Sequence, residues 1–263
     1  IVAMGTSLPE TAVSVTASLV NNNELAVSNV VGSNIFNLMV VVGVCSILTP
    51  ILVQKETIKR DIPFSMICAF LLLGLGILAV GDKSGMTLGH LDGMILLGFF
   101  AGYIVAMIQS AMKARAAGKN VEIEGIEELE EEIGILSWPK SILFIVGGAL
   151  AIAFGGDLTV DAASRIAIDL GMSQTLVGLT IVSIGTSLPE LVTSVVAARK
   201  NEVDMAVGNA VGSNIFNILM VLGIASAINP VALIRENIID IVILIVFSLI
   251  VWIYAATKRK ISR

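Results

Sequence analysis

The strongest constraint on the fold is an internal repeat. Residues 1–50 align with residues 181–230 without a gap, at a constant offset of 180, and 26 of the 50 positions are identical. Two hexapeptides recur unchanged: Gly-Thr-Ser-Leu-Pro-Glu at 5–10 and 185–190, and Gly-Ser-Asn-Ile-Phe-Asn at 32–37 and 212–217. Chance similarity between apolar segments does not reproduce two hexapeptides together with the spacing between them. The chain therefore contains two homologous halves.

The composition is that of an integral membrane protein. Of the 263 residues, 56% are hydrophobic and 14% are charged, and the mean hydropathy is +0.94; soluble domains average about 25% charged residues. Several charge-free runs approach or reach the roughly 17–25 residues that a spanning helix needs. They cover 62–81, 93–112, 141–156, 171–189, 205–234 and 241–257. The net charge of −5 comes mainly from one acidic stretch, so it predicts no nucleic-acid partner.

The spans between the two copies make the repeat inverted. Each copy joins a span with the Pro-Glu motif to a second span with the Ser-Asn motif through a short polar segment. Two more spans follow the first copy, at about 61–80 and 92–112, and another begins at about 140. Because five span steps separate a helix from its copy, the copies cross the membrane in opposite directions. We count about eight spans, the first of them incomplete.

Charge placement orients these spans. The first inverted half, 1–112, and the second, 139–263, are joined by an acidic linker at 113–138, with seven glutamates between 121 and 132. If the linker is cytoplasmic, 13 of the 16 Lys and Arg residues fall on the cytoplasmic side, as the positive-inside rule requires. We therefore predict a multi-pass protein of the cell membrane with a cytoplasmic linker. The linker is expected to be solvated, because it lacks the turn glycines of a calcium-binding loop.

The first motif places a charge and hydroxyl groups together at membrane depth. On a helix, Thr6, Ser7 and Glu10 share one face. The proline of the motif has no N–H and frees the carbonyl of Gly5, and such broken backbone needs protein or an aqueous cavity as its partner. This glycine also permits close approach of a helix or an ion. Since a carboxylate costs ~2.5–3.5 kcal/mol at this depth, Glu10 and its copy Glu190 are predicted to form a functional site.

The second motif adds further oxygen atoms. Ser33 and Asn37 lie four residues apart, as do their copies Ser213 and Asn217, and Asn29 and Asn209 extend these faces by one more turn. Inversion brings both motifs of both halves together near the middle of the membrane, where carboxylate, hydroxyl, amide and backbone oxygens suit Ca²⁺ and Na⁺. Neither motif contains His or Cys, which argues against Zn²⁺ or Cu⁺. Two carboxylates without a cation repel each other, so we expect the ions to compete and the loaded site to change face.

Packing explains some of the surrounding residues equally well. Ser33 and Ser213 are also accounted for by close helix packing alone. The neighbours expected to form hydrogen bonds between helices, and not to bind ions, are Asn34, Asn214, Ser14 and Ser194. Cys45 and Cys68 lie in apolar runs without ligand spacing and are predicted to be buried small hydrophobic residues. The run from Ser141, with charges following it at helical spacing, predicts one long helix that leaves the membrane or lies tilted in it.

At these motifs the chain closely resembles the sodium/calcium exchanger family of the cation/Ca²⁺ antiporters, whose repeats carry G-T-S-[L/I/A]-P-E and G-S-N-[I/V]-x-N. Both signatures are complete and in the expected order, and the resemblance covers essentially the whole chain. The G-N-x-x-E-type repeats of proton/calcium exchangers are absent, which favours sodium coupling. The resemblance implies a ten-helix, all-α, inverted-repeat antiporter fold with four central ion sites. A first gating helix and a last helix after position 263 are expected to be missing or truncated here.

The resemblance also implies the ligands, position by position. Glu10 and Glu190 would be shared Ca²⁺ ligands that also help to hold Na⁺. Hydroxyl, amide or backbone oxygens would come from ten further residues: Thr6, Thr186, Ser7, Ser187, Ser33, Ser213, Asn37, Asn217, Ala3 and Ser183. Some relatives have Asp where this chain has Asn217, which leaves the stoichiometry and any potassium dependence open. The family slides a pair of helices across the bundle, and the helix from about 140 would be the second of that pair.

The sequence therefore predicts a prokaryotic-type Na⁺/Ca²⁺ antiporter that works by alternating access. It is not predicted to be an enzyme or to need a cofactor: Ca²⁺ and Na⁺ are the transported ions, the lipid bilayer surrounds it, and we infer no obligate protein partner. Alternatives are a proton-coupled or potassium-assisted exchanger and a cation channel lined by the two glutamates, although channels usually arrange such groups by oligomeric symmetry. An intramembrane hydrolase is disfavoured, because no His or Lys accompanies Ser7 or Ser187 as a base.

Overall fold

The computed structural model describes residues 2–20, 22–78, 86–116, 138–200, 202–258 and 260–261. This part of the chain forms eight helical segments, several of them interrupted by breaks or by five-residue π-helical turns, labelled η. In chain order they are α1 (Val2–Thr6) and α2 (Leu8–Leu19); α3 (Asn23–Phe36), η1 (Asn37–Val41) and α4 (Val42–Leu48); η2 (Thr57–Asp61) and α5 (Ile62–Leu78); α6 (His90–Ala116); α8 (Trp138–Asp169); α9 (Gln174–Val177), η3 (Gly178–Val182), α10 (Ser183–Thr186) and α11 (Leu188–Arg199); α12 (Val203–Phe216), η4 (Asn217–Val221) and α13 (Leu222–Ile228); and α14 (Arg235–Lys258).

Many of these segments can cross a membrane. Five are long and apolar enough, and a sixth qualifies if the bent pair Leu179–Thr186 and Leu188–Arg199 counts as one span. The five are 25–48, 57–78, 90–113, 204–228 and 235–257. The expectation of a helical, multi-pass membrane protein is confirmed, while the count of eight spans stays a prediction for α1–α2 and α8. The segment after Ser141 lies within one helix of 32 residues, as the sequence predicted.

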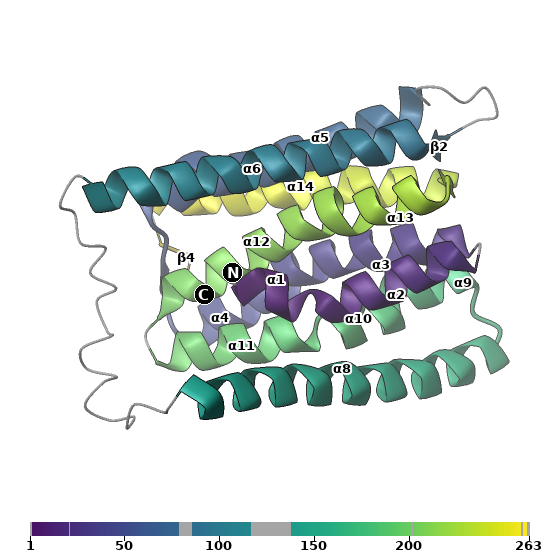
Figure 1. Ribbon diagram of the computed structural model, residues 1–263, viewed down its shortest axis with the longest axis horizontal. Helices are drawn as coiled ribbons and strands as arrows, with labels where there is room; N and C mark the ends of the chain where they lie inside the picture. Colours follow the sequence, from purple (N-terminus) through teal and green to yellow (C-terminus); the bar gives the residue numbers. More distant parts are fainter. Residues whose placement is uncertain are drawn as a thin grey trace.

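The two repeats adopt the same series of elements. The order α1, α2, α3, η1, α4 recurs as α10, α11, α12, η4, α13, and each pair ends 180 residues apart. Figure 1 shows α2 running toward the end of the bundle where α9 lies, whereas α11 runs the opposite way. The repeat is therefore inverted, as the span count required.

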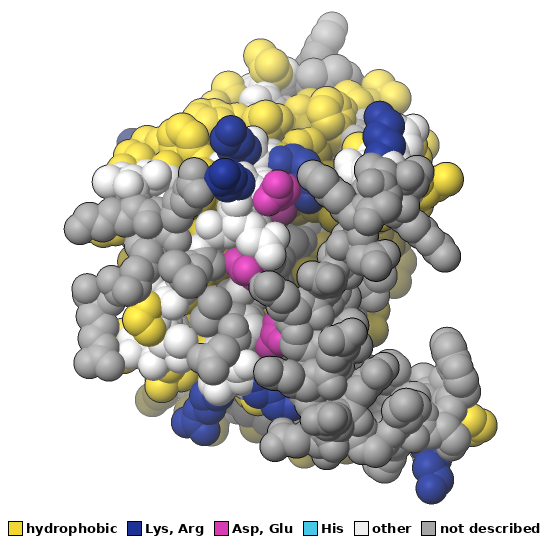
Figure 2. Space-filling model, turned by 90° about the vertical axis from the view of Figure 1, so that its left-hand side faces the viewer, with side chains coloured by type: hydrophobic (Ala, Val, Ile, Leu, Met, Phe, Trp, Pro, Cys, Tyr) yellow, Lys and Arg dark blue, Asp and Glu magenta, His cyan; other side chains and the backbone are white. Residues whose placement is uncertain are grey.

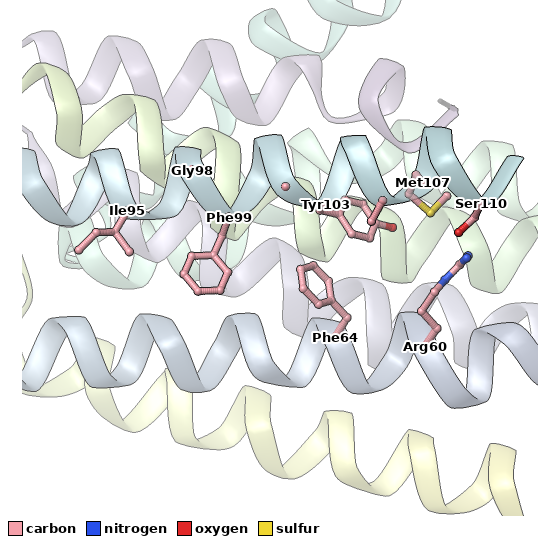
Figure 3. Close-up of a pocket in the computed structure, with 10 residues that line it drawn as sticks. Arg60, Phe64, Ile95, Gly98, Phe99, Tyr103, Met107 and Ser110 are labelled. Carbon is pink, nitrogen blue, oxygen red and sulfur yellow. The ribbon is translucent and has the colours of Figure 1, made fainter. Parts of the chain in front are cut away.

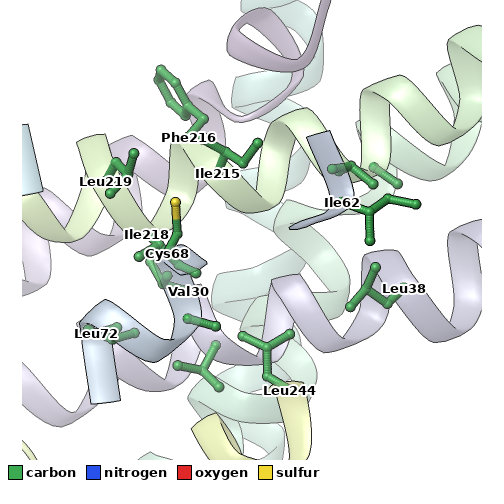
Figure 4. Packing of buried hydrophobic residues seen from close by; sticks show 14 of the residues in the cluster. Val30, Leu38, Ile62, Cys68, Leu72, Ile215, Phe216, Ile218, Leu219 and Leu244 are labelled. Atoms are coloured by element: carbon green, nitrogen blue, oxygen red, sulfur yellow. The ribbon is translucent and has the colours of Figure 1, made fainter. Parts of the chain in front are cut away.

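The second span of each repeat lies in the middle of the molecule. The most apolar window of 204–228 is 72% buried and that of 25–48 is 61% buried, compared with 17% for 90–113. Figure 1 shows α5, α6 and α14 along one side of these helices and α8 along the opposite side. The main hydrophobic core joins α3, α5, α12 and α14, with Leu72, Leu219 and Leu244 almost completely buried (Figure 4). The Ser-Asn motifs are thus placed away from lipid.

Two pairs of short strands join segments at the ends of the bundle. The all-helical prediction did not include them. β1 (Ile51–Leu52) pairs antiparallel with β4 (Lys260–Ile261), and β2 (Thr87–Leu88) pairs antiparallel with β3 (Val231–Ala232). The residues just before the paired segments include prolines in both repeats, at Pro50 and at its copy Pro230. A proline disfavours helix for the residue before it, so the helices end there and the chain continues extended.

One end of the bundle carries much of the positive charge. Figure 2 views the end where α6 stops and α8 begins, and it shows Lys and Arg side chains at several places. This agrees with the charge asymmetry in the sequence. The predicted acidic linker, 113–138, lies almost wholly outside the described residues. Cys45 and Cys68 are buried free thiols, as expected.

A cavity of about 620 Å³ lies between α5 and α6 (Figure 3). Its walls are mainly apolar, with the rings of Phe64 and Tyr103 stacked at 4.8 Å, and the guanidinium of Arg60 lies at one end. Arg60 forms an ion pair with Asp61 at 2.7 Å. No residue of the predicted ion site lines this cavity.

Candidate ion-binding site

Each Pro-Glu motif breaks its helix. The break falls at Ser7 between α1 and α2 and at Ser187 between α10 and α11, and both serines leave helical geometry, with ψ angles of 14° and 4°. The second break bends the span by 49°. In both copies the proline follows in the first turn of the next helix, where its missing N–H costs no hydrogen bond. The expected interruption of the backbone is therefore present in both halves.

The two glutamates are fully buried and each is held by the opposite repeat. Ser7 donates to Oε1 of Glu190 at 2.8 Å, and Ser187 donates to Oε1 of Glu10 at 3.1 Å. Both carboxyl groups have no exposed surface. Ser213 makes a second bond to Oε1 of Glu190 at 3.1 Å. Each glutamate therefore accepts a hydrogen bond from the serine of the Pro-Glu motif in the other half of the chain.

The threonines of the motifs contact asparagines one turn away on the Ser-Asn helices. Thr186 donates to Oδ1 of Asn29 at 3.1 Å, and Thr6 donates to Oδ1 of Asn209 at 3.4 Å. Asn29 donates in turn to Ser14 at 3.0 Å. The equivalent bond in the second repeat joins Asn209 and Ser194, which bears out helix contact as the role of both serines.

Ser33 and the two backbone carbonyls lie in the same region. Ser33 contacts the Thr186 hydroxyl at 3.3 Å and donates to the carbonyl of Ser183 at 3.4 Å. Its copy Ser213 donates to the carbonyl of Ala3 at 3.5 Å. The structure therefore brings these carbonyls and hydroxyls together with the motif that contains Glu190.

The four asparagines of the Ser-Asn motifs form a closed set of bonds across the two halves. Nδ2 of Asn34 donates to the carbonyl of Asn214 at 3.2 Å, and Nδ2 of Asn214 donates to the carbonyl of Asn34 at 3.1 Å. Nδ2 of Asn37 donates to Oδ1 of Asn214 at 3.2 Å, and Nδ2 of Asn217 donates to Oδ1 of Asn34 at 3.1 Å. All four side chains are buried. The expected bonds between helices at Asn34 and Asn214 are confirmed.

Four buried acceptor atoms of these motifs have no protein partner. They are Oε2 of Glu10, Oε2 of Glu190, Oδ1 of Asn37 and Oδ1 of Asn217. An unpaired buried carboxylate or amide oxygen costs several kcal/mol in an apolar interior. Each repeat supplies one oxygen of each kind, at copied positions. Such a set can accept a cation, because hard cations bind carboxylate, amide and hydroxyl oxygens.

All twelve predicted site residues lie within or beside this group of contacts. One feature was not predicted. The π-helical turns η1 and η4 begin at Asn37 and Asn217, the last residues of the two Ser-Asn motifs; such turns are often found at functional sites. Asn29 and Asn209, which the sequence placed on the same face as the motif residues, accept hydrogen bonds from the two threonines. Among the described residues, no cluster of three or more His, Cys, Asp or Glu could hold a metal ion.

The fold and this site define the class of protein: an inverted-repeat membrane transporter with an oxygen-lined centre. The sequence model described as "Sodium/calcium exchanger protein" matches residues 1–109 and 140–263. The chain belongs to the sodium/calcium exchanger family, whose members are transporters and not enzymes.

Individual relatives agree with this assignment. A protein of Alkalimonas amylolytica that carries the antiporter name CaxA is 40% identical over 234 residues, which cover 88% of this chain and 69% of that protein. The sodium/calcium exchanger MaX1 of Methanosarcina acetivorans is 31% identical over 287 residues, covering all of this chain and 82% of the relative. A solved structure of the sodium-calcium exchanger NCX_Mj, soaked with Na⁺ and Sr²⁺, superimposes with a TM-score of 0.74 at 30% identity, covering 100% of this chain and 79% of that chain.

Proposed function

We propose that this protein is a secondary active antiporter that exchanges Na⁺ for Ca²⁺, with both ions competing for the central site built on Glu10 and Glu190. The observation that carries the proposal is the set of four buried, unpartnered oxygens contributed equally by the two repeats. Family membership supports cation exchange, and the relatives named as sodium/calcium exchangers support the choice of ions. The twelve predicted site residues are the proposed ligands or their direct supports.

The site suits competition between ions of different charge. Two buried carboxylates bring two negative charges, which one Ca²⁺ neutralises completely and which Na⁺ ions can neutralise by binding together. Without a cation the carboxylates repel each other at a site that water does not reach freely. The loaded site is therefore the form expected to change face, which makes transport an exchange.

Alternating access is supported by the position of α8. This helix contacts α2, α9, η3 and α10 along one side of the bundle. Around it, Ala167, Val177 and Val182 form a small hydrophobic cluster that is separate from the main core. A helix outside the main core can shift along the bundle without opening that core. We propose that α8 moves in this way as the site changes face.

Flux measurements test the exchange. Purified protein in proteoliposomes loaded with Na⁺ is diluted into medium with radioactive Ca²⁺ and no Na⁺, with the membrane potential clamped. Ca²⁺ uptake is expected only when Na⁺ is inside. Vesicles loaded with K⁺, and vesicles with a pH gradient in place of a Na⁺ gradient, test the other coupling ions. Uptake that is indifferent to internal Na⁺ would contradict the proposal, and uptake without any internal exchange ion would indicate a channel.

Variants locate the exchange at the two glutamates. Glu190→Gln and Glu10→Gln are each expected to lower Ca²⁺ uptake by about 100-fold or more, because losing one partner of a buried charged site costs about 3–5 kcal/mol. Glu236→Gln, at an exposed glutamate in the first turn of α14, is the matched control and should keep full uptake. Ca²⁺ binding measured on the same preparations separates lost binding from lost movement. Retained uptake in Glu190→Gln would remove its proposed role.

The orientation in the cell membrane is part of the proposal. We place the acidic linker, 113–138, in the cytoplasm on the basis of the charge asymmetry. A single cysteine at Lys113 in a chain without Cys45 and Cys68 is expected to be protected from an impermeant thiol reagent in intact cells. Labelling of this cysteine in intact cells would contradict the proposed orientation and place the linker on the outer side of the membrane.

A further inference from the structure

We propose that Asn34 and Asn214 are positioning residues: they fix which end of the Asn217 and Asn37 amides faces the cation. This inference rests on the proposed function of the central site and adds two residues to it. An asparagine amide has an oxygen at one end and an NH₂ group at the other, and the two ends have nearly the same shape. Only the oxygen can bind a cation. Something must therefore decide which end points to the ion.

The polarity of the bonds is set by two backbone carbonyls. A carbonyl oxygen can only accept, so the atom of Asn34 that contacts the carbonyl of Asn214 at 3.2 Å must be its NH₂ group. The reciprocal bond at 3.1 Å fixes Asn214 in the same way. The remaining end of each of these side chains is consequently an oxygen, and it can only accept.

The fixed oxygens then orient the second pair of amides. Oδ1 of Asn34 accepts from Asn217 at 3.1 Å, and Oδ1 of Asn214 accepts from Asn37 at 3.2 Å. Asn217 and Asn37 must turn their NH₂ groups toward these acceptors, so their oxygens are directed away. Those two oxygens are the buried ones without a protein partner. Each backbone carbonyl thus fixes the orientation of one asparagine amide, and that amide fixes the orientation of the next, whose oxygen faces the cation site.

The Asn217 oxygen belongs to a helix face that contacts one of the acids. Asn217 lies four residues after Ser213, which donates to Glu190, so both side chains lie on one face of the helix. Loss of the Asn34 side chain would leave the Asn217 amide free to rotate. Its NH₂ group would then face the ion for part of the time, and its positive end would weaken cation binding.

A purely structural role for Asn34, as a tie between the two halves, predicts a different pattern of defects. The two can be separated because an aspartate has an oxygen at both ends and needs no orientation. Asn34→Ala is therefore measured in three backgrounds: the natural sequence, Asn217→Asp, whose amide Asn34 orients, and Asn37→Asp, whose amide Asn34 does not touch. Asn37→Asp is the matched control, since it adds the same charge at the copied position.

The measurements are the half-saturating Ca²⁺ concentration and maximal rate of Na⁺-driven uptake, with the Ca²⁺-induced rise in Tm of detergent-solubilised protein as a readout that needs no transport. Asn34→Ala is expected to raise the half-saturating concentration about tenfold in the natural and Asn37→Asp backgrounds, but less than threefold in the Asn217→Asp background. Asn214→Ala should show the mirror pattern and be relieved by Asn37→Asp. Asn34→Leu, which is close to asparagine in size and offers no acceptor to the Asn217 amide, is tested alongside with the same expected pattern in case the smaller alanine prevents folding.

Two outcomes would overturn the inference. An equal loss in all three backgrounds, accompanied by a lower Tm without ions, would assign Asn34 to holding the halves together. An unchanged half-saturating concentration in the natural background would show that the Asn217 amide is oriented without Asn34. Both results leave the exchange itself standing, whereas absence of Na⁺-driven uptake in the unmodified protein would remove the proposed function and not this bonding scheme.

Discussion

The two repeats carry the same motifs, yet their surroundings differ. Glu190 accepts two hydroxyl bonds on Oε1, from Ser7 and Ser213, whereas Glu10 accepts one, from Ser187. Identical sequence motifs therefore give two sets of oxygen atoms of the same kinds that are held by different numbers of hydrogen bonds.

A second difference lies at a position that the two copies do not share. Position 3 is alanine in the first copy and serine at 183 in the second. The Ser183 hydroxyl donates to the carbonyls of Ser28 and Asn29 at 3.3 Å and 3.1 Å, which brings α10 against α3. Ala3 makes no such bond, because it has no hydroxyl. Under the proposed alternating access, unequal support of the two copies is expected to give the two openings of the site different energies.

The glycines that begin the Ser-Asn motifs give the largest expected contrast. A methyl group at Gly32 would lie 2.9 Å from Cβ of Ser183 and against its hydroxyl, whereas one at Gly212 would lie 3.0 Å from Cβ of Ala3, which has no hydroxyl. Gly32→Ala is expected to destabilise the protein by about 3 kcal/mol, at the upper end for overpacking, and Gly212→Ala by about 1 kcal/mol. Thermal unfolding in detergent measures both.

Equal losses of Tm in the two glycine variants would remove the claimed asymmetry in helix packing. A larger loss for Gly212→Ala would reverse it. Gly5→Ala is the control from the other motif, since nothing lies within 4 Å of a methyl group there, and its Tm should be close to that of the unmodified protein.

The serines of the same motifs give a smaller contrast. Ser213 donates to the carboxylate of Glu190, whereas Ser33 contacts a hydroxyl and a backbone carbonyl. Bonds to charged groups contribute about 1.5–3 kcal/mol, and neutral bonds about 0.5–1.5 kcal/mol. Ser213→Ala is therefore expected to raise the half-saturating Ca²⁺ concentration about tenfold, and Ser33→Ala about threefold. Equal effects in Ca²⁺ uptake would mean that both serines act mainly as ion ligands.

Much of the architecture was predictable because it follows from patterns of identity and charge. The offset of 180 predicted both copies, and an odd number of spans predicted their inversion. Proline and glycine positions predicted the breaks at Ser7 and Ser187. Burial of Glu10 and Glu190 followed from the cost of leaving a carboxylate in lipid.

Other details depend on contacts between distant helices, which no local pattern encodes. Gly5 was expected to permit close approach, but the closest approach is at Gly32, where α3 meets η3 and α10. The polarity of the asparagine bonds depends on which carbonyl of the other half lies within reach of Asn34. The π-helical turn at Asn37 arises from one extra residue per turn, and apolar sequence around it gives no sign of this. Tertiary packing decides all three.

Thr11 offers the smallest test of the comparison, because it is a difference between the copies that should matter little. Thr11 donates through its hydroxyl to the carbonyl of Ser7 at 2.9 Å, and the second repeat has Leu191 at this position. The Ser7 carbonyl also accepts from the Thr11 backbone at 3.2 Å, just as the Ser187 carbonyl accepts from the Leu191 backbone at 3.1 Å. Thr11→Leu removes only the added side-chain bond, so Ca²⁺ affinity and maximal uptake should stay within about twofold of the unmodified protein, a change below about 0.5 kcal/mol. A tenfold loss would show that this hydroxyl holds the broken turn beside Glu10 in place, and that the first repeat needs a support which the second obtains from packing.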